Sequence, residues 1–415
     1  MSQATQPQSD QSTRDLFCIP DGDVVYLCGN SLGLMPMRAR EAVIEELDDW
    51  ARLGVEGHFK SKDNWYRYHE TCREMGARLV GALPHEVVFM NTLTVNLHLM
   101  MVSFFRPVGK KRKILVDWPI FPSDLYAVKS QLRLHGLEEN DLLIAKPRDG
   151  EHTLRTEDVV ALIEQHRDEI ALVLLAGVNF ATGQWMDMPG ITKACRELAV
   201  TIGWDCAHAA GNVPMRLHDW GADFACWCTY KYMNSGPGAV AGCFIHERHH
   251  AKMNPDAFVQ MPRCEGWWGN DPDGRFVMGS EFAPVASADA WQVSNPPILS
   301  FVPVKVSLEI FDEVGMDALR ARSIELTKHL ESCINGIGSD RLSIVTPREP
   351  DRRGCQLSVA IGGGDPQSVF VRVKEAGLIA DFRQPNIIRL APVPLYNTID
   401  DCERAAGILA SVVDR

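Results

Sequence analysis

Two residues with complementary chemistry, Asp205 and Lys231, lie close together in the middle of this sequence. Asp205 ends a short apolar run with the pattern of a β-strand, and Lys231 follows a second such run. Ligands of an open α/β sheet bind outside the carboxyl ends of its strands, so we expect both side chains at one crevice. His208 and Tyr230 follow the same two runs. The sequence therefore predicts a site with a carboxylate, an amine, an imidazole and a phenol.

An acidic residue after one strand and a lysine after a neighbouring strand form the pair that pyridoxal phosphate requires. The lysine amine forms a Schiff base, and the carboxylate keeps the ring nitrogen protonated, so that the ring accepts electrons. Lys231 precedes the turn sequence NSGPG at residues 234–238. Taken alone, Asp205 is also an ordinary cap or turn residue, and a loop lysine is usually solvated. The combination favours the cofactor.

The composition limits the class of protein. At 415 residues with 46% hydrophobic content, the chain can bury a large core, and its length favours two domains or one domain with a satellite. The formal charge of −12 is spread without a basic block, which argues against nucleic acid and membrane surfaces as partners. The N-terminus lacks a signal pattern, and no run approaches the ~18 apolar residues of a membrane span. We expect an acidic, soluble, cytoplasmic protein.

Neither a disulfide framework nor a metal site is expected. The twelve cysteines show no CxxC motif. Several lie in apolar runs, where a small buried side chain is suitable: Cys206, Cys226, Cys228 and Cys243. The sequence HERHH at residues 246–250 has no carboxylate or cysteine partner at ligand spacing, so we interpret it as a solvated loop.

One motif points to different chemistry. The sequence GNSLG at residues 29–33 matches the G-x-S-x-G pattern of serine hydrolases, with Ser31 as the nucleophile. Such a nucleophile follows a strand in a sheet that earlier strands have begun. Only about thirty residues precede Ser31, so we disfavour this interpretation.

Further residues suit a cofactor site. Residues 91–98 open a helix after a strand, and free N–H groups at a helix start bind phosphate, although N-capping by Thr92 or Thr94 explains the same pattern. The chain has neither a P-loop nor a G-x-G-x-x-G motif. Phe121 is suited to stack on a flat ring, and Asp124 to cap a helix or to hydrogen-bond in the pocket.

Two basic residues have both a functional and a structural interpretation. Arg389 stands in an otherwise apolar strand-like run. Such an arginine usually has a bidentate partner, which is either a substrate carboxylate or the carboxylate of an ion pair within the protein. His58 lies in a predicted loop, where it either contacts a ligand or remains at the surface.

The order of the predicted elements indicates an α/β fold. Strands and helices alternate up to about residue 245, which predicts a mainly parallel sheet with right-handed crossovers. Residues 255–295 form a long irregular loop of a kind that is usually functional. The last part predicts helices and a second group of strands: helices at 298–313, 315–335 and 366–376, and strands at 342–346, 355–360 and 377–381.

Six separate segments together closely resemble the kynureninase family: DCAH at 205–208, CWCTYK at 226–231, FPSD at 121–124, NTLTVNLHL at 91–99, GW at 266–267 and RLAPVPLYN at 389–397. The resemblance extends from about residue 26 to near the C-terminus. It implies the aspartate-aminotransferase-like fold type I of pyridoxal-phosphate enzymes, in the class V aminotransferase group. The implied division is an N-terminal arm and segment associated with the small domain at 1–50, a large cofactor-binding domain at 51–300 and a smaller α+β C-terminal domain at 301–415.

The resemblance also implies roles for individual residues. Lys231 would form the Schiff base, Asp205 would pair with the ring nitrogen, and Tyr230 would bind the phosphate and donate a proton. The other implied cofactor contacts are Leu93 and Thr94 at the phosphate, Phe121 and Asp124 at the ring, His208 beside the cofactor, and Trp267 and Asn295 from the partner subunit of a homodimer with shared active sites. Where a member of the family has a serine, this chain has Ala176, so one hydroxyl contact at the cofactor is absent.

The implied reaction is hydrolytic cleavage of the β–γ carbon bond of L-kynurenine or 3-hydroxy-L-kynurenine, in tryptophan catabolism or NAD biosynthesis. The products are anthranilate or 3-hydroxyanthranilate, and L-alanine. Arg389 would bind the substrate's α-carboxylate, and His58, Asn270 and Asn295 would lie near its ring. An alternative is another class V enzyme such as a cysteine desulfurase, for which Cys355 is the candidate persulfide residue. A catalytically silent binding protein on the same fold is a second alternative.

Overall fold

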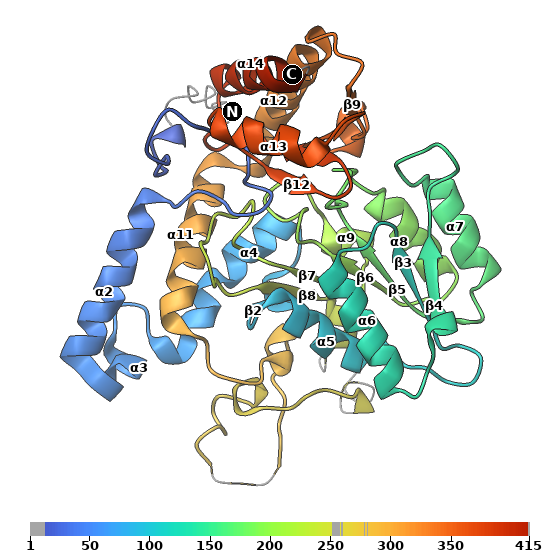
Figure 1. Cartoon of the computed structure of the whole chain (residues 1–415). Coiled ribbons are helices and arrows are strands. Elements are labelled where there is room, and N and C mark those ends of the chain that lie inside the picture. Colours follow the sequence, from blue (N-terminus) through green and yellow to red (C-terminus); the bar gives the residue numbers. More distant parts are fainter. Residues whose placement is uncertain (1–12, 251–257, 259, 278, 280, 414–415) are drawn as a thin grey trace, which may run out of the picture.

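The computed structural model describes residues 13–250, 258, 260–277, 279 and 281–413. Its centre is a seven-stranded sheet (Figure 1), in which β8 is antiparallel to both neighbours and the other adjacent pairs are parallel. The spatial order is β2 (Val87–Phe89), β8 (Gly242–Ile245), β7 (Phe224–Trp227), β6 (Ile202–Asp205), β5 (Ile170–Ala176), β3 (Lys113–Asp117) and β4 (Leu142–Ala145). The mainly parallel sheet is therefore confirmed. β8 differs because the chain between β7 and β8 forms no crossover helix.

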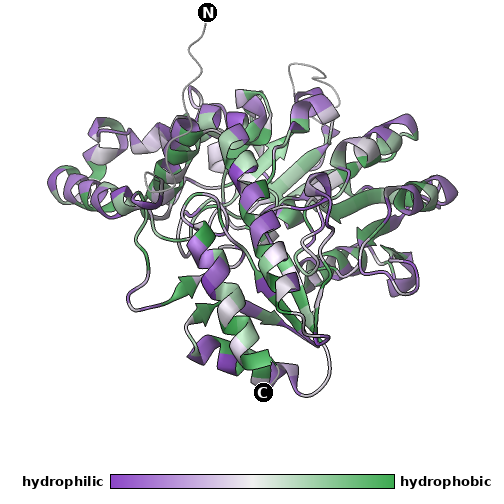
Figure 2. Ribbon diagram, turned by 90° about the horizontal axis from the view of Figure 1, so that it is seen from above, coloured by the Kyte–Doolittle hydropathy of each residue, from purple (hydrophilic) through white to green (hydrophobic). Residues whose placement is uncertain are grey.

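Both faces of this sheet are buried. Along β7, Phe224 and Cys226 belong to one apolar cluster, whereas Ala225 and Trp227 belong to the cluster on the opposite face. This two-residue alternation, with apolar residues at every position, is typical of a strand covered on both sides. Figure 2 shows the hydrophobic strands between helices whose polar surfaces face outward.

Helices and short 3-10 turns surround the sheet. The helices of this part are α2 (Met37–Leu53), α3 (Gly57–Lys60), α4 (Arg73–Val80), α5 (Leu93–Phe104), α6 (Pro122–Leu134), α7 (Thr156–Gln165), α8 (Met188–Glu197), α9 (Leu217–Trp220) and α11 (Ile298–Val314). The 3-10 turns are η1 (Gly54–Glu56), η2 (Trp65–Cys72), η3 (Pro84–Glu86), η4 (Glu139–Asp141), η5 (Glu247–His249), η6 (Trp267–Gly269) and η7 (Ala288–Trp291). Apolar residues of α5 and α6 pack in one of the two clusters, and those of α7, α8 and α9 pack in the other.

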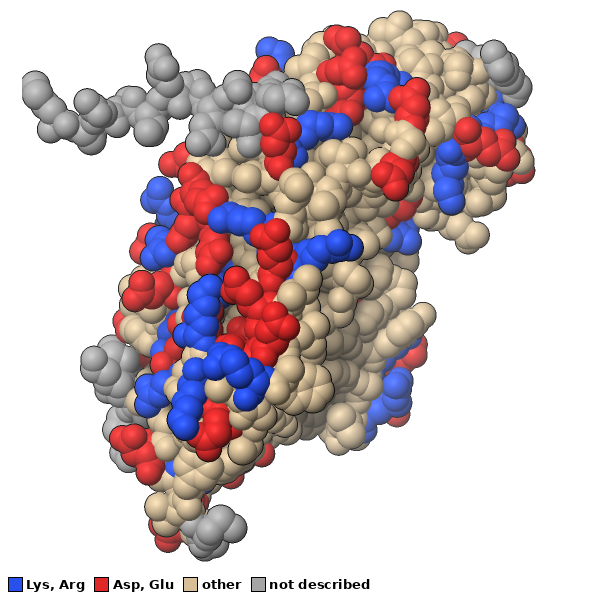
Figure 3. Space-filling view, turned by 90° about the vertical axis from the view of Figure 1, so that its left-hand side faces the viewer, with Lys and Arg blue, Asp and Glu red and all other residues tan. Residues whose placement is uncertain are grey.

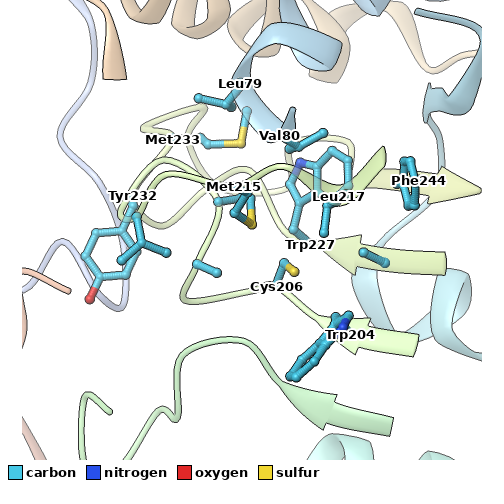
Figure 4. Packing of buried hydrophobic residues seen from close by; sticks show 14 of the residues in the cluster. Leu79, Val80, Trp204, Cys206, Met215, Leu217, Trp227, Tyr232, Met233 and Phe244 are labelled. Atoms are coloured by element: carbon cyan, nitrogen blue, oxygen red, sulfur yellow. The ribbon is translucent and has the colours of Figure 1, made fainter. Parts of the chain in front are cut away.

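Close packing fixes the strands that lead into the predicted site. A Cβ atom at Gly242 would lie 2.2 Å from the Trp227 ring, and one at Gly203 would lie 2.0 Å from the Phe224 ring. Only glycine leaves room for these rings. Trp227 is fully buried and packs with residues of α4 and α9, as Figure 4 shows. The ends of β6 and β7 are therefore held rigidly.

A second, smaller body follows and has its own apolar cluster. Its antiparallel sheet has the order β12 (Asp381–Arg383), β13 (Ile387–Leu390), β10 (Leu357–Ile361) and β9 (Leu342–Ile344). Its remaining elements are α12 (Met316–Gly336), η8 (Pro350–Arg352), α13 (Pro366–Glu375) and α14 (Ile399–Val413). This body lies at the top in Figure 1. The predicted α+β character of the C-terminal part is confirmed.

The N-terminal segment joins this smaller body. β1 (Val25–Tyr26) pairs in parallel with β11 (Leu378–Ile379), and Arg14 donates a 2.8 Å hydrogen bond to Asp401 of α14. Residues 1–12 of the predicted arm lie outside the described residues. The exact boundaries 1–50, 51–300 and 301–415 stay a prediction.

The interpretation of residues 246–250 as a solvated loop is wrong. His246 is half-buried and His250 is 1% exposed. The fully buried carboxylate of Glu86 lies beside His246 and accepts hydrogen bonds from the backbone N–H groups of Leu83 and Glu247, at 2.9 and 2.7 Å. The sequence could not show this carboxylate, because it comes from a distant part of the chain.

The carboxylate of Glu86 also contacts the His218 ring, at 3.0 Å. Glu86, His218 and His246 together have the composition of a metal-ligand set. However, the two imidazoles are stacked, with centroids 5.0 Å apart and planes inclined by 22°. Since a metal ion lies in the plane of each imidazole that binds it, two stacked rings are poorly placed to share an ion. We therefore assign a structural role, and no metal site, to these three residues.

The surface of the protein carries charges of both signs, and its cysteines are free thiols. On the face that carries α2, Lys and Arg side chains are interspersed with Asp and Glu (Figure 3). No helix among the described residues is both long and apolar enough to cross a membrane. All twelve cysteines are free, and Cys206, Cys226, Cys228 and Cys243 are buried as expected.

We predict that Glu86→Ala lowers the free energy of unfolding by about 3 kcal/mol or more, because two part-buried backbone N–H groups and the His218 ring lose their partner. Urea titration measures this change. The control is Glu74→Ala, whose side chain is 76% exposed and which should change stability by less than about 0.5 kcal/mol. Equal effects of the two variants would contradict the role of Glu86.

Candidate active site

A cavity of about 280 Å³ lies where the carboxyl ends of β3, β5 and β6 meet the loop after β7. This is the position at which open α/β sheets bind ligands. Eight of the predicted site residues line it: Leu93, Thr94, Phe121, Asp124, Asp205, His208, Tyr230 and Lys231. The structure thus brings together predicted residues from four separate segments of the chain.

The amine of Lys231 is held within this cavity. Its Nζ lies 3.1 Å from Nε2 of His208 and 5.7 Å from the centroid of the Phe121 ring. The backbone N–H of Gly33 donates to the Tyr230 carbonyl at 2.8 Å, which fixes the loop that carries the lysine. A Cβ at position 33 would lie 2.3 Å from the Lys231 carbonyl oxygen, so only glycine permits this approach.

His208 is a neutral imidazole. Burial, followed by the positive charges of Lys231 and Arg389, lowers the pKa of His208 well below its ordinary value. A neutral ring can accept a hydrogen bond from the lysine. The Nδ1 atom of His208 is buried without a hydrogen-bond partner among the described residues, so it remains available to a bound group.

Three buried carboxylates also line the cavity, those of Asp117, Asp124 and Asp205. Asp205 Oδ1 accepts the N–H of Ala207 at 2.8 Å. Burial and the negative charge of Asp205 raise the pKa of Asp124 well above its ordinary value, and Oδ1 of Asp124 has no partner among the described residues. Burial likewise raises the pKa of Asp117 to about 6. Such a cluster favours a ligand that supplies a cationic N–H group.

Two helix starts meet at the cavity. α5 begins at Leu93, and the side chain of Thr92 at its N-cap makes no capping hydrogen bond. α6 begins at Pro122 after Phe121, again without a side-chain cap. The hydroxyls of Thr94 and Ser123 lie 2.8 Å apart between them. Helix starts without side-chain caps are suited to an anion such as phosphate.

These groups fit pyridoxal phosphate. The cavity combines an amine for an aldehyde, a carboxylate for a protonated ring nitrogen, an aromatic side chain beside the amine and an anion site at two helix starts. Oδ1 of Asp124 is a buried acceptor that none of the described residues satisfies. Ala176 also lines the cavity, where its N–H donates to Asp117 at 3.0 Å.

Four predicted site residues lie away from the cavity lining. Trp267 is 52% exposed, and its Nε1 donates to the Arg275 carbonyl at 2.7 Å. Asn295 is exposed. Asn270 accepts the N–H of Ala283 at 2.7 Å, and His58 contacts the Trp65 ring edge-on at 5.7 Å. Their roles at the site stay predictions.

Arg389 is also outside the lining and is only 1% exposed. Its guanidinium forms a bidentate pair with Asp381, which includes a 2.5 Å bond from Nε to Oδ1. Nη1 donates to the carbonyl of Phe180 at 2.8 Å, and Phe180 lines the cavity. The ion pair that was one of the two sequence interpretations is therefore present, next to the cavity.

Two residues of the site were missed in the sequence. Asp117 ends β3 as Asp205 ends β6, and this repeated pattern was the available signal. Phe180 follows β5 and packs edge-on against the Phe121 ring, at 5.2 Å. No local pattern in the sequence distinguished Phe180 from other aromatic residues in loops.

The two alternative nucleophiles do not line the cavity. Ser31 follows β1, which pairs with β11 of a two-stranded sheet and not within the seven-stranded sheet. Cys355 is fully buried, and its burial raises the pKa of the thiol to about 12. A buried, protonated thiol is a poor nucleophile. Neither residue supports a serine hydrolase or a desulfurase.

Solved structures of similar shape share the fold at low sequence identity. The cysteine desulfurase of Escherichia coli has a TM-score of 0.78 and 16% identity, with 98% of this chain and 99% of that chain covered. The cysteine desulfurase of Thermococcus onnurineus has a TM-score of 0.74 and 17% identity, with 94% and 95% covered. This similarity shows the fold alone. The fold is that of the fold type I, class V enzymes, as expected.

Sequence relatives are much closer. The family model described as "Kynureninase C-terminal domain" matches residues 319–409. A kynureninase of Salinispora tropica is 52% identical, with 98% of this chain and 95% of that protein covered. One of Myxococcus xanthus is 52% identical, with 94% and 91% covered. Because half of the residues are identical over almost the whole length, this chain belongs to the kynureninase family.

Proposed function

We propose that this cavity catalyses the hydrolytic cleavage of the β–γ carbon bond of L-kynurenine or 3-hydroxy-L-kynurenine. The products are anthranilate or its 3-hydroxy form, and L-alanine, within tryptophan breakdown or NAD synthesis. One observation carries the proposal: Lys231, Asp205 and two uncapped helix starts meet in one cavity of a chain that belongs to the kynureninase family.

Pyridoxal phosphate, when bound, supplies an aldehyde for amines and a ring that withdraws electrons from the substrate. Lys231 would hold the aldehyde carbon, and Asp205 would hold the ring nitrogen. Phe121 would stack on the ring, while the N–H groups of Leu93 and Thr94 would bind the phosphate. Asp124 and His208 each have a buried atom without a partner in the described part of the chain, and these atoms would complete the ring contacts.

Two side chains are placed to move protons. Nζ of Lys231 would remove the α-proton of the substrate, and the neutral His208 ring, 3.1 Å away, would orient the amine by accepting a hydrogen bond from it. Burial raises the pKa of Tyr230 above its ordinary value, which keeps its Oη protonated. Tyr230 would bind the phosphate and give its proton to the substrate's β-carbon after the carbon–carbon bond breaks.

The chain would act as a cytoplasmic homodimer with shared sites. Trp267 and Asn295 are exposed and would complete the cofactor site of the partner subunit. Large apolar side chains are also exposed on α2 and the turns after it: Met37, Ile44, Trp50, Val55 and Phe59, all between 48% and 76%. An apolar surface of this kind usually becomes buried in an interface. Asn270 and His58 would then contact the substrate ring.

Lys231→Ala should reduce kynurenine cleavage roughly a thousandfold or more, because it removes both the cofactor anchor and the base. Borohydride reduction of the wild-type enzyme followed by peptide mapping should place the cofactor label on Lys231. The control is Lys193→Ala, at an exposed helix position, which should retain full activity. Labelling of another lysine would remove the central assignment.

Asp205→Asn should lower kcat about a hundredfold and change cofactor retention much less, because a neutral amide holds the ring nitrogen in place but does not keep it protonated. Cofactor absorbance and steady-state kinetics measure the two effects. The exposed Asp168→Asn is the control. Wild-type kcat in the Asp205 variant would count against its role.

Shared sites predict complementation between inactive subunits. Lys231→Ala and Trp267→Ala enzymes, unfolded and refolded together, should regain activity, because a mixed dimer contains one site with both residues intact. A mixture of Lys231→Ala with Asp205→Asn should gain nothing, since both residues line the same cavity of one chain. Absence of recovery in the first mixture, with dimers present, would exclude the shared site.

A further inference from the structure

The buried pair of Arg389 and Asp381 lies at the border between the two bodies of the protein. The two residues face each other across the antiparallel strands β12 and β13. The Arg389 side chain is 1% exposed, and that of Asp381 is 16% exposed. The strand register therefore places the carboxylate directly against the guanidinium.

Asp381 occupies only one edge of the guanidinium. Its carboxylate binds Nε and Nη2, and the carbonyl of Phe180 binds Nη1. A guanidinium has five N–H groups, and these contacts use three of them. One N–H on Nη1 and one on Nη2 have no partner among the described residues. Two N–H groups on different nitrogens can together bind a further carboxylate.

The guanidinium is connected to the cavity through Phe180. The Phe180 carbonyl accepts hydrogen bonds from Arg389 and from Nε2 of Gln356, at 2.8 and 3.0 Å. Its side chain lines the cavity and contacts the Phe121 ring. The charge of Arg389 is one of the causes that lower the pKa of His208, which also lines the cavity. The positive charge of Arg389 therefore acts on the cavity, although the guanidinium is buried and lies outside the cavity lining.

We propose that Asp381 is a positioning residue, which fixes the Nε–Nη2 edge of Arg389 so that the remaining N–H groups are presented to the α-carboxylate of the substrate. This inference rests on the proposed function. A flexible arginine would lose rotamer entropy when it binds a substrate, and the strand pair has already removed this freedom. Asp381 also compensates the buried positive charge before the substrate arrives.

Asp381→Asn tests the proposal. It replaces one acceptor oxygen with an NH2 group that faces the N–H groups of Arg389, and so releases the arginine. We expect KM for kynurenine to rise roughly tenfold to a hundredfold, the range of one charge-assisted hydrogen bond, while kcat changes much less. Asp381→Glu, which keeps the charge, should recover much of the loss.

Binding of two ligands separates positioning from general damage. Titrations of the cofactor absorbance should show weaker binding of kynurenine in Asp381→Asn, but unchanged binding of kynuramine, the same molecule without its α-carboxylate. Arg383→Gln is the control, because Arg383 also contacts Asp381, at 3.2 Å, from a more exposed position. It should bind both ligands as the wild type does.

The outcomes are distinct. Equal weakening for both ligands, or an unchanged affinity for kynurenine, would overturn the positioning role of Asp381. If the Asn variant does not fold, Asp381→Ser keeps one hydroxyl acceptor and is judged by the same two titrations. A wild-type enzyme that binds kynurenine without cleaving it would overturn the proposed function, while the titrations would still decide the role of Asp381.

Discussion

The cavity depends on the burial of negative charge without a full set of partners. Asp117, Asp124 and Asp205 reach it from different segments, and burial raises the pKa of two of them. Carboxylates so placed are costly unless a cation or a proton is shared among them. A protonated ring nitrogen satisfies this requirement, and Lys231 lies on the same cavity. The rest of the large body holds these groups in place, through strands that are packed on both faces.

The local pattern of the sequence was sufficient to predict which polar residues lie at the ends of the central strands. The polar residues after β6 and β7 meet as the topology of a parallel sheet requires. Asp205 and Lys231 could be paired because each closes its own apolar run. The family resemblance added residues that no pattern suggests, among them Leu93.

Contacts between distant segments could not be predicted. The interpretation of His246 failed because its neighbour Glu86 comes from another part of the chain, and a histidine-rich sequence is read as polar when its partners are unknown. Arg389 and Asp381 are eight residues apart, but only the register of the hairpin between β12 and β13 shows that they face each other. A single sequence does not contain this register.

The N-terminal segment has a mechanical consequence. Cys28 forms a backbone β-bridge to Ala391 of the smaller body. Five residues later, the N–H of Gly33 donates a hydrogen bond to the carbonyl of Tyr230, the residue before Lys231. The turn between these two contacts is closed by hydrogen bonds from the N–H groups of Ser31 and Leu32 to the Cys28 carbonyl, at 2.9 and 3.1 Å. The smaller body and the loop that carries the reactive amine are therefore joined through one short hydrogen-bonded turn, so that the position of one limits the position of the other.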